Sequence, residues 1–440
     1  MSSISFLSKT RGTRNLVSRI RTVLNNFGIS SKKFEYLLRR YSTITLNLGC
    51  VPSFPITAVI LKRHPKLIRK LSQQGVEFAV HGYIHTDYGV LPFEKQKRHY
   101  KKAIDTFIKY RVPFTGFRAP FLRTNDMTFK VISNLGFNYD SSRTVHWDVI
   151  DKNKYSNEWS EYEKILTFYK SQQAEDCLSL PRFINGFVEI PVSIPDDEVM
   201  KERLNITDVR EIEGLWKSIL ETTYYRGELF TLQLHPERIL HCDYALEHLI
   251  QYARRLNPTV WIASLKEITE WWKERDKFTF KIHSQGNNKY RVEANCSNRA
   301  TILLKNGKVN TKADPWFDGY QIVTKRNFIL ESPKRPVIGI GLDSSPAAIK
   351  FLKSEGYITE QSNESGNYEI FFDKLTQFDE SKERVISELV EQSDAPLLRY
   401  WRWPGRTRSA LSITGDIDSI TLIDFVLRIL ENCWQNLKKS

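Results

Sequence analysis

The chain has few cysteines and no long uninterrupted hydrophobic run. Its 440 residues include five cysteines, and no two of them have the Cys-x-x-Cys spacing of a zinc ribbon or a redox site. Widely separated thiols also argue against a disulfide framework and favour a reducing compartment. No segment approaches the roughly 18 apolar residues of a membrane-spanning helix, and basic residues interrupt residues 1–24 before a signal-peptide core forms. We therefore expect a cytoplasmic protein.

Acidic residues are nearly absent from the first 40 positions, which hold nine lysines and arginines and one acidic residue, Glu35. This stretch carries +8 of the formal net charge of +14. A solvated helical face explains such a run, but clustered basic side chains also gain energy beside an anionic surface. The basic segment 1–30 therefore allows peripheral membrane contact or attraction of a nucleotide- or lipid-linked substrate. No signature of a nucleic-acid-binding module accompanies the charge, so nucleic acid is not an expected partner.

The order of the expected elements predicts an α/β fold. From residue 31 to 275, short apolar runs alternate with stretches of helical periodicity, which predicts a parallel sheet, open or closed into a barrel. Residues 276–335 have alternating apolar positions and turn pairs, and they predict a small β-rich module. Residues 336–404 have the pattern of a small α/β module, and residues 405–440 return to an apolar strand, an acidic loop and an amphipathic helix.

Two histidines, His81 and His85, stand four positions apart directly after an apolar run. Neutral imidazole is a common zinc ligand, and two residues at this spacing can converge on one ion. The pair follows the expected carboxyl end of a strand, where barrels and open α/β sheets build their sites. A metal site needs a further ligand, however, and hydrogen-bonded loop histidines are the alternative.

Five stretches resemble, in order, the second to last motifs of the polysaccharide deacetylases, carbohydrate esterases of the NodB-homology type. The stretches are VHGYIHTDY, GFRAPFLRTND, GFNYDSS, FTLQLHPE and VWIASLKEITEWW, and the likeness spans roughly residues 31–273. Several motifs in the right order are far more specific than any one of them. The resemblance implies a distorted (β/α) barrel that hydrolyses an N- or O-acetyl group on a sugar. It also implies one divalent metal ion, often zinc, bound by one aspartate and two histidines.

The first motif of this family, Thr-Phe-Asp-Asp-Gly, is missing upstream of the histidines, where residues 42–61 contain no carboxylate. A similar stretch stands near the other end, where an apolar run leads into Thr414-Gly415-Asp416-Ile417-Asp418. Residues two apart on an extended segment face the same way, so both carboxylates can point into one pocket. We therefore expect a circularly permuted barrel with its first strand and helix at residues 405–440 and the small modules inserted before them. Capping aspartates at a helix start are the alternative.

The resemblance implies that Asp418, His81 and His85 bind the metal ion. Asp416 would be the general base, although one residue separates two aspartates that are adjacent in the commoner motif, so their division of roles stays open. Arg118 matches the arginine that orients the base.

His235 matches the histidine that acts as general acid and protonates the departing amine. Such an acid needs a carboxylate partner to stay protonated near neutral pH, and Asp140 or Asp148 is a candidate for that partner. The aspartate pair Asp196-Asp197 also stands on an expected rim loop, and a solvated turn without chemistry is the favoured interpretation.

Phe121, Trp147 and Tyr83 are the candidate substrate-binding residues. Phe121 stands where the family motif usually has tyrosine, and it would contribute its backbone N–H to an oxyanion. Trp147, with His146, would line the groove because aromatic faces suit sugar rings, but packing in the core explains the same residues equally well.

The leading hypothesis is therefore a metal-dependent polysaccharide deacetylase of a polysaccharide biosynthetic pathway. One alternative keeps the same site and attacks another non-peptide C–N bond, such as that of a cyclic amide. A second alternative is a non-catalytic carbohydrate-binding or scaffold protein, which requires that Asp416 and Asp418 lie away from the histidines.

Overall fold

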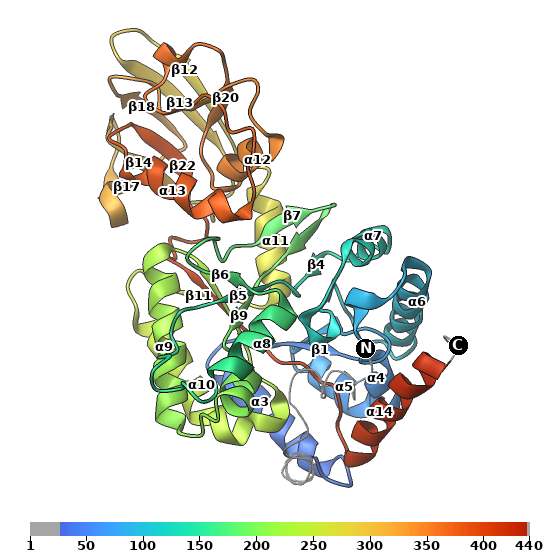
Figure 1. Ribbon diagram of the computed structural model, residues 1–440. Coiled ribbons are helices and arrows are strands. Elements are labelled where there is room, and N and C mark those ends of the chain that lie inside the picture. Colours follow the sequence, from blue (N-terminus) through green and yellow to red (C-terminus); the bar gives the residue numbers. More distant parts are fainter. Residues whose placement is uncertain (1–26, 438–440) are drawn as a thin grey trace.

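The computed structural model describes residues 27–437, and its larger unit is a curled sheet covered by helices (Figure 1). All pairings in this nine-stranded sheet are parallel except that of β7 with β8. The strands follow one another in the order β10 (Leu229–Gln233), β23 (Ala410–Thr414), β1 (Ser53–Ile56), β2 (Glu77–Val80), β3 (Gly116–Phe117), β4 (Tyr139–Asp140), β8 (Phe187–Glu189) and β7 (Arg182–Ile184), and β11 (Trp261–Ile262) pairs with β23.

The sheet curls because two of its strands bend into a second, three-stranded sheet. After short joints, β4 leads into β5 (Thr144–His146) and β8 leads into β9 (Val192–Ile194), which pair with each other, while β6 (Gln172–Gln173) pairs with β5. Strand β9 also contacts β10, so the two ends of the strand order approach each other. This confirms the predicted α/β fold with a distorted barrel.

Helices surround the curled sheet, and several begin with sequence signals for helix starts. Ser264 and Glu267 form a capping box at the start of α11, and Asn125 and Thr128 form another at the start of α7. None of the helices within residues 27–437 is long and apolar enough to cross a membrane. The helices of this unit are α3 (Lys32–Asn47), α4 (Ala58–Arg63), α5 (Pro65–Gln73), α6 (Phe93–Lys109), α7 (Asp126–Asn134), α8 (Trp159–Tyr169), α9 (Val209–Arg226), α10 (Ile239–Arg255), α11 (Leu265–Arg275) and α14 (Leu422–Leu437).

Strand β23, near the end of the sequence, is an interior strand of the sheet and lies between β10 and β1. All five of its residues are buried, as expected for an apolar strand that is covered on both faces. It pairs along its whole length with β10, and Thr414 also pairs with Ser53 of β1. This is the position that the predicted circular permutation requires, and the relation to an unpermuted ancestor stays a prediction.

Gly415 links β23 to the loop that carries the two aspartates, and it has no room for a side chain. A Cβ atom there would lie far inside van der Waals contact of the Leu234 carbonyl oxygen, while the Gly415 N–H is held by the Ser53 carbonyl at 3.1 Å. We expect Gly415→Ala to destabilise the protein by about 1–3 kcal/mol, because backbone must move. Gly214→Ala, at an open position of α9, should instead stabilise it by about 0.5–1 kcal/mol.

Thermal unfolding of the two alanine variants beside the parent protein tests this prediction. The expected result is a lower midpoint for Gly415→Ala and an equal or higher midpoint for Gly214→Ala. Equal midpoints for parent and Gly415→Ala would show that the loop after β23 is not packed as described.

The remaining residues form a second unit, drawn at the top of Figure 1. It contains two four-stranded sheets. The strands of the first are, in order, β12 (Thr279–Ser284), β13 (Lys289–Asn295), β18 (Asn327–Glu331) and β15 (Lys308–Val309). Those of the second are β16 (Ala313–Pro315), β17 (Tyr320–Val323), β14 (Ile302–Lys305) and β22 (Leu397–Tyr400). A three-stranded parallel sheet of β20 (Thr359–Gln361), β19 (Ile338–Ile340) and β21 (Phe371–Phe372) lies with α12 (Pro346–Ser354) and α13 (Glu383–Gln392). Because β22 pairs with β14, the predicted modules 276–335 and 336–404 share a sheet, and their boundary stays a prediction.

Residues 1–26, most of the predicted basic segment 1–30, lie outside the described residues. The described chain begins beside α14, because Gly28 bridges to Thr421 and the Phe27 ring stacks on Phe425. Four cysteines have described side chains, and these are free thiols.

Candidate metal and catalytic site

The two histidines of the loop after β2 meet an aspartate of the loop after β23. The Nδ1 atom of His81 lies 2.9 Å from the Arg118 carbonyl oxygen, which can only accept, so Nδ1 carries the proton and donates it. The Nε2 atom of His81 then faces Asp418 Oδ1 at 3.3 Å, and His85 Nε2 lies 3.0 Å from Asp418 Oδ2. The structure therefore brings together the three side chains that the sequence predicted as metal ligands.

These three side chains fit a divalent cation. One donor atom from each lies within 4.8 Å of the other two, and His81 Nε2 and Asp418 Oδ1 are buried without a hydrogen-bond partner among the described residues. Burial lowers the pKa of His85 to about 4, so its imidazole is neutral, as a ligand must be. Burial opposes ionisation of Asp418, but His85 and the Arg428 guanidinium hold the pKa of this carboxyl well below its usual value. Two neutral imidazoles and one carboxylate are ligands typical of catalytic zinc.

Asp416 is held beside this cluster by a buried arginine. The Nη1 atom of Arg118 donates to Asp416 Oδ1 at 3.0 Å and to Thr414 Oγ1 at 2.9 Å. The other side of the guanidinium donates to the carbonyl and hydroxyl oxygens of Ser141 at 2.8 and 2.9 Å. Asp416 Oδ2 lies 3.7 Å from His81 Nε2, so one carboxylate oxygen is fixed by Arg118 and the other faces the cluster.

His235, in the loop after β10, is paired with an aspartate that the sequence interpretation misjudged. Its Nδ1 atom lies 2.8 Å from Asp197 Oδ1, and its backbone N–H donates to Asp197 Oδ2 at 3.1 Å. Asp197 is 2% exposed, so it does not lie in a solvated turn. The carboxylates proposed as partners lie elsewhere, because Asp140 accepts from the Ser142 hydroxyl at 2.6 Å and Asp148 is exposed. The partner assignment to Asp140 or Asp148 was wrong.

The Asp197 carboxylate keeps His235 protonated. Burial disfavours the imidazolium, but the charge of Asp197 and its hydrogen bond to Nδ1 raise the pKa of His235 well above its usual value. Asp196, Asp197 and His235 also have metal-ligand spacing. Arg238 already neutralises Asp197 at 3.2 Å, however, and the Nδ1 atom of His235 is engaged, so this group is arranged for proton donation rather than for a cation.

The pairing makes a prediction for the pH profile. Asp197→Asn removes the charge that holds the proton on His235, so the pKa of His235 falls. The protonated acid is then lost at lower pH, and we expect the alkaline limb of kcat to move toward acid pH with little change at the lowest pH values. The exposed Asp148→Asn is the matched control and should keep the parent profile. An unshifted profile for Asp197→Asn would contradict the role of this pair.

The three candidate substrate-binding residues lie in different settings. Phe121 packs edge-on against His85, with ring centroids 4.3 Å apart, and its φ of 59° is strained for a bulky residue, as residues at functional sites often are. Trp147 is 2% exposed and packs in the core, which leaves no ring face for a sugar in this conformation. Tyr83 lies against α6, where the Lys102 ammonium stands 5.5 Å from its ring centroid. Substrate binding by these residues stays a prediction.

Sequence reasoning missed Asp197 and Arg428 as parts of the site. Arg428 of α14 donates to Asp418 Oδ2 at 2.9 Å, and nothing in the sequence connects it with the histidines. The position of Asp197 in the sequence could have indicated its role. It follows the buried strand β9, just as His235 follows β10. The carboxyl ends of parallel strands share one edge of a sheet, so a carboxylate after β9 is placed near that edge.

Comparison with known proteins identifies part of this unit. Residues 52–139 match the family model described as polysaccharide deacetylase, a range that contains the two histidines and Arg118. A curated relative is the peptidoglycan deacetylase-like protein FGM2 of Gibberella zeae, 25% identical over 239 residues, which are 47% of this chain and 66% of that protein. The chain therefore matches just under two thirds of the length of that relative.

Solved structures that align with this chain include a probable polysaccharide deacetylase from Pseudomonas aeruginosa PAO1. That structure is 18% identical, with a TM-score of 0.44 over 59% of this chain and 78% of the other. The Puue allantoinase is also 18% identical, with a TM-score of 0.42 over 54% of this chain and 72% of the other.

Proposed function

We propose that this chain removes an acetyl group from a sugar by metal-dependent hydrolysis, because residues 52–139 match the polysaccharide deacetylase family model. The observation that carries the proposal is the meeting of His81 and His85 with Asp418, which is separated from them by most of the sequence. A scaffold protein that has lost catalysis has no reason to keep this arrangement beside Asp416 and His235. The proposal uses the family for the class of substrate and the geometry for the residues.

The residues divide the chemistry among them. His81, His85 and Asp418 would hold the cation, which when bound would supply Lewis-acid stabilisation and lower the pKa of the attacking water. Asp416, held in orientation by Arg118, takes the proton from that water through its Oδ2 atom.

His235 is the general acid that donates a proton to the leaving group, and its Nδ1 atom is held by Asp197. This leaves Nε2 to give a proton to the departing amine, and the raised pKa keeps that proton available at neutral pH. The backbone N–H of Phe121 serves the oxyanion.

We assign the substrate to an acetylated sugar or oligosaccharide in polysaccharide biosynthesis, N-acetylated or O-acetylated. The charge of residues 1–40 supports a nucleotide- or lipid-linked form, met in the cytoplasm or at the membrane surface. The native metal in this proposal is zinc.

Acetate release tests the proposal directly. We expect the zinc-loaded protein to release acetate from an oligomer of N-acetylglucosamine, and the chelated protein to regain this activity when zinc returns. Hydrolysis of a cyclic amide without acetate release would favour the alternative C–N hydrolase. A zinc-loaded protein that hydrolyses neither class of compound would contradict the proposal.

A further inference from the structure

Helix α14 exposes an apolar stripe. Among residues 422–431, the part of the helix whose side chains are described, the exposed positions are Ile423, Val426 and Leu430, which are 59%, 47% and 51% exposed. Residues three and four positions apart lie on one side of a helix, so these side chains form one stripe. A helix of a folded protein usually turns such a stripe toward the core, whereas α14 turns it outward.

The charged side chains of α14 point toward the barrel instead. Asp424 is buried, and its Oδ2 atom lies 2.8 Å from His64 Nε2. Glu431 pairs with Arg63, and Arg428 reaches the candidate metal site, as described above. These contacts fix the rotation of the helix about its axis. The apolar stripe therefore stays exposed, because turning it inward would break all three contacts.

The first described residues lie beside the same helix. Gly28 bridges to Thr421, and its carbonyl oxygen accepts from the Leu422 N–H at 3.0 Å. The next residue, Ile29, is 80% exposed, so it places another apolar side chain near the first turn of α14. Exposed apolar side chains that gather in this way mark an interaction surface. We define the α14 face as the side chains of Ile29, Ile423, Val426 and Leu430.

Basic residues surround this helix. Helices α4 and α5, whose joint contacts α14, contain no acidic residue, and α5 exposes Lys66, Arg69 and Lys70. Residues 1–26 hold five more basic residues and no acidic one, and they join the described chain where Phe27 contacts α14. Clustered basic side chains attract an anionic surface over a distance of about 10 Å at 0.1 M salt. The α14 face therefore belongs to a positively charged part of the molecule.

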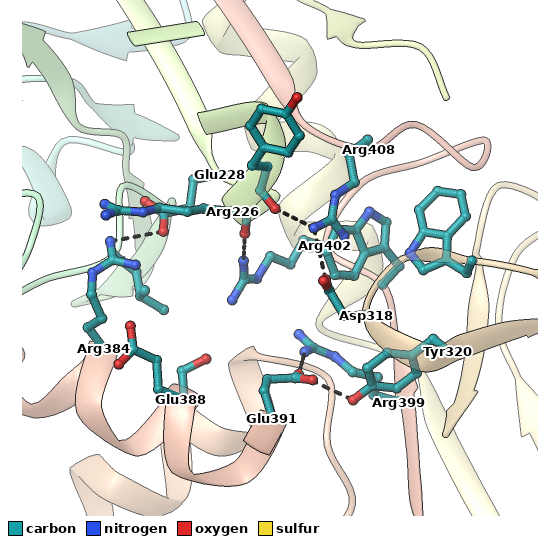
Figure 2. A pocket seen from close by; sticks show the side chains of 15 residues that line it. Arg226, Glu228, Asp318, Tyr320, Arg384, Glu388, Glu391, Arg399, Arg402 and Arg408 are labelled. Carbon is teal, nitrogen blue, oxygen red and sulfur yellow. Dashed lines mark hydrogen bonds and ion pairs between the residues drawn. The ribbon is translucent and has the colours of Figure 1, made fainter. Parts of the chain in front are cut away.

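The second unit lies at the other end of the barrel. Figure 2 shows where the two units meet, with Arg384 paired to Glu228 at 2.9 Å and Arg408 paired to Asp318 at 3.0 Å. Glu228 directly precedes β10 and Arg408 shortly precedes β23, so this junction lies at the amino ends of the two strands. Helix α14 follows the carboxyl end of β23, and Figure 1 shows it away from the second unit. The second unit therefore leaves the α14 face uncovered.

We propose that the α14 face docks on the surface of an anionic lipid membrane. A helix with an apolar face beside clustered basic residues lies in the plane of the membrane interface, with its apolar side chains between the headgroups. A second copy of this chain is a poorer partner, because it brings the same basic residues to the contact and like charges repel. Docking holds the candidate metal site, which Arg428 joins to α14, close to the lipid. Its use for a lipid-linked sugar rests on the proposed function, but the docking itself does not.

The test is co-sedimentation of the full chain with vesicles of phosphatidylcholine mixed with phosphatidylglycerol, an anionic lipid. We expect the protein to bind these vesicles, to bind pure phosphatidylcholine vesicles about tenfold more weakly or less, and to dissociate as added salt screens the charges. Val426→Asp should weaken binding to the anionic vesicles about tenfold or more, because an apolar group at the interface becomes a charge that the lipid repels. Ile423→Ser, which adds no charge, should weaken it by a smaller factor.

Leu389→Asp is the matched control, because this α13 residue is 54% exposed on the second unit. It should bind the anionic vesicles as the parent does, and all three variants should keep the thermal midpoint of the parent because the replaced side chains are exposed. Parent-like binding by Val426→Asp, or equal binding of the parent to both kinds of vesicle, overturns the proposal. A parent that dimerises through this face without binding vesicles overturns it as well. Acetate release is not a readout here, so an inactive metal site leaves these outcomes unchanged.

Discussion

Asp418→Ala should lose stoichiometric metal. One of only three protein ligands disappears, and the two remaining histidines leave an open, weakly held ion. Even partners that only orient a ligand are worth about 10–100-fold in metal affinity, so we expect a loss of more than about 100-fold. Elemental analysis and zinc titration of the purified protein measure this, and acetate release should fall with the metal content.

Asp343→Ala, at an exposed position of the second unit, is the control and should keep one metal ion per chain. Removing the chain from residue 410 onward is a poor substitute for the point variant. That deletion takes out β23 and leaves β10 and β1 without their shared neighbour, so it would unfold the barrel whatever the metal does. Full metal content in Asp418→Ala would show that Asp418 is not a ligand.

Asp416→Asn should separate catalysis from metal binding. The amide keeps the size of the carboxylate and its oxygen can still accept from Arg118, but it cannot take a proton. We expect the metal content of the parent and a fall in kcat of about 10²- to 10⁴-fold, the usual contribution of a positioned general base.

His235→Ala makes the matching test of the general acid and should also keep the metal. A variant Asp416→Asn that loses its metal would move Asp416 into the ligand set and reassign the two aspartates. Activity within a few-fold of the parent in either variant would show that the replaced residue has no role in proton transfer.

The metal cluster could be predicted because the family resemblance pointed to these residues and because a rule of parallel sheets makes their meeting plausible. His81 and His85 follow β2, Asp416 and Asp418 follow β23, and residues after the carboxyl ends of such strands gather at one edge of the sheet. The apolar run of β23 identified it as a buried strand although its neighbours in the sheet are distant in sequence.

The rest of the site depended on packing that a sequence does not display. The turn-like pair Asp196-Asp197 is buried because Arg238 and His235 satisfy Asp197, and these partners come from another loop. Trp147 is equally suited to a sugar or to a core, and only the surrounding side chains decide.

The position of β23 between β10 and β1 has a consequence for the order in which the protein is made. A ribosome completes β1 and β10 long before it reaches β23, and until then each of these strands presents an open edge of unpaired N–H and C=O groups. Such edges invite pairing with other chains, and domains made early usually fold early. Here Asp416 and Asp418 arrive together with the strand that seals the sheet, so the nascent chain gains the closure of its sheet and the last candidate metal ligand in a single late step.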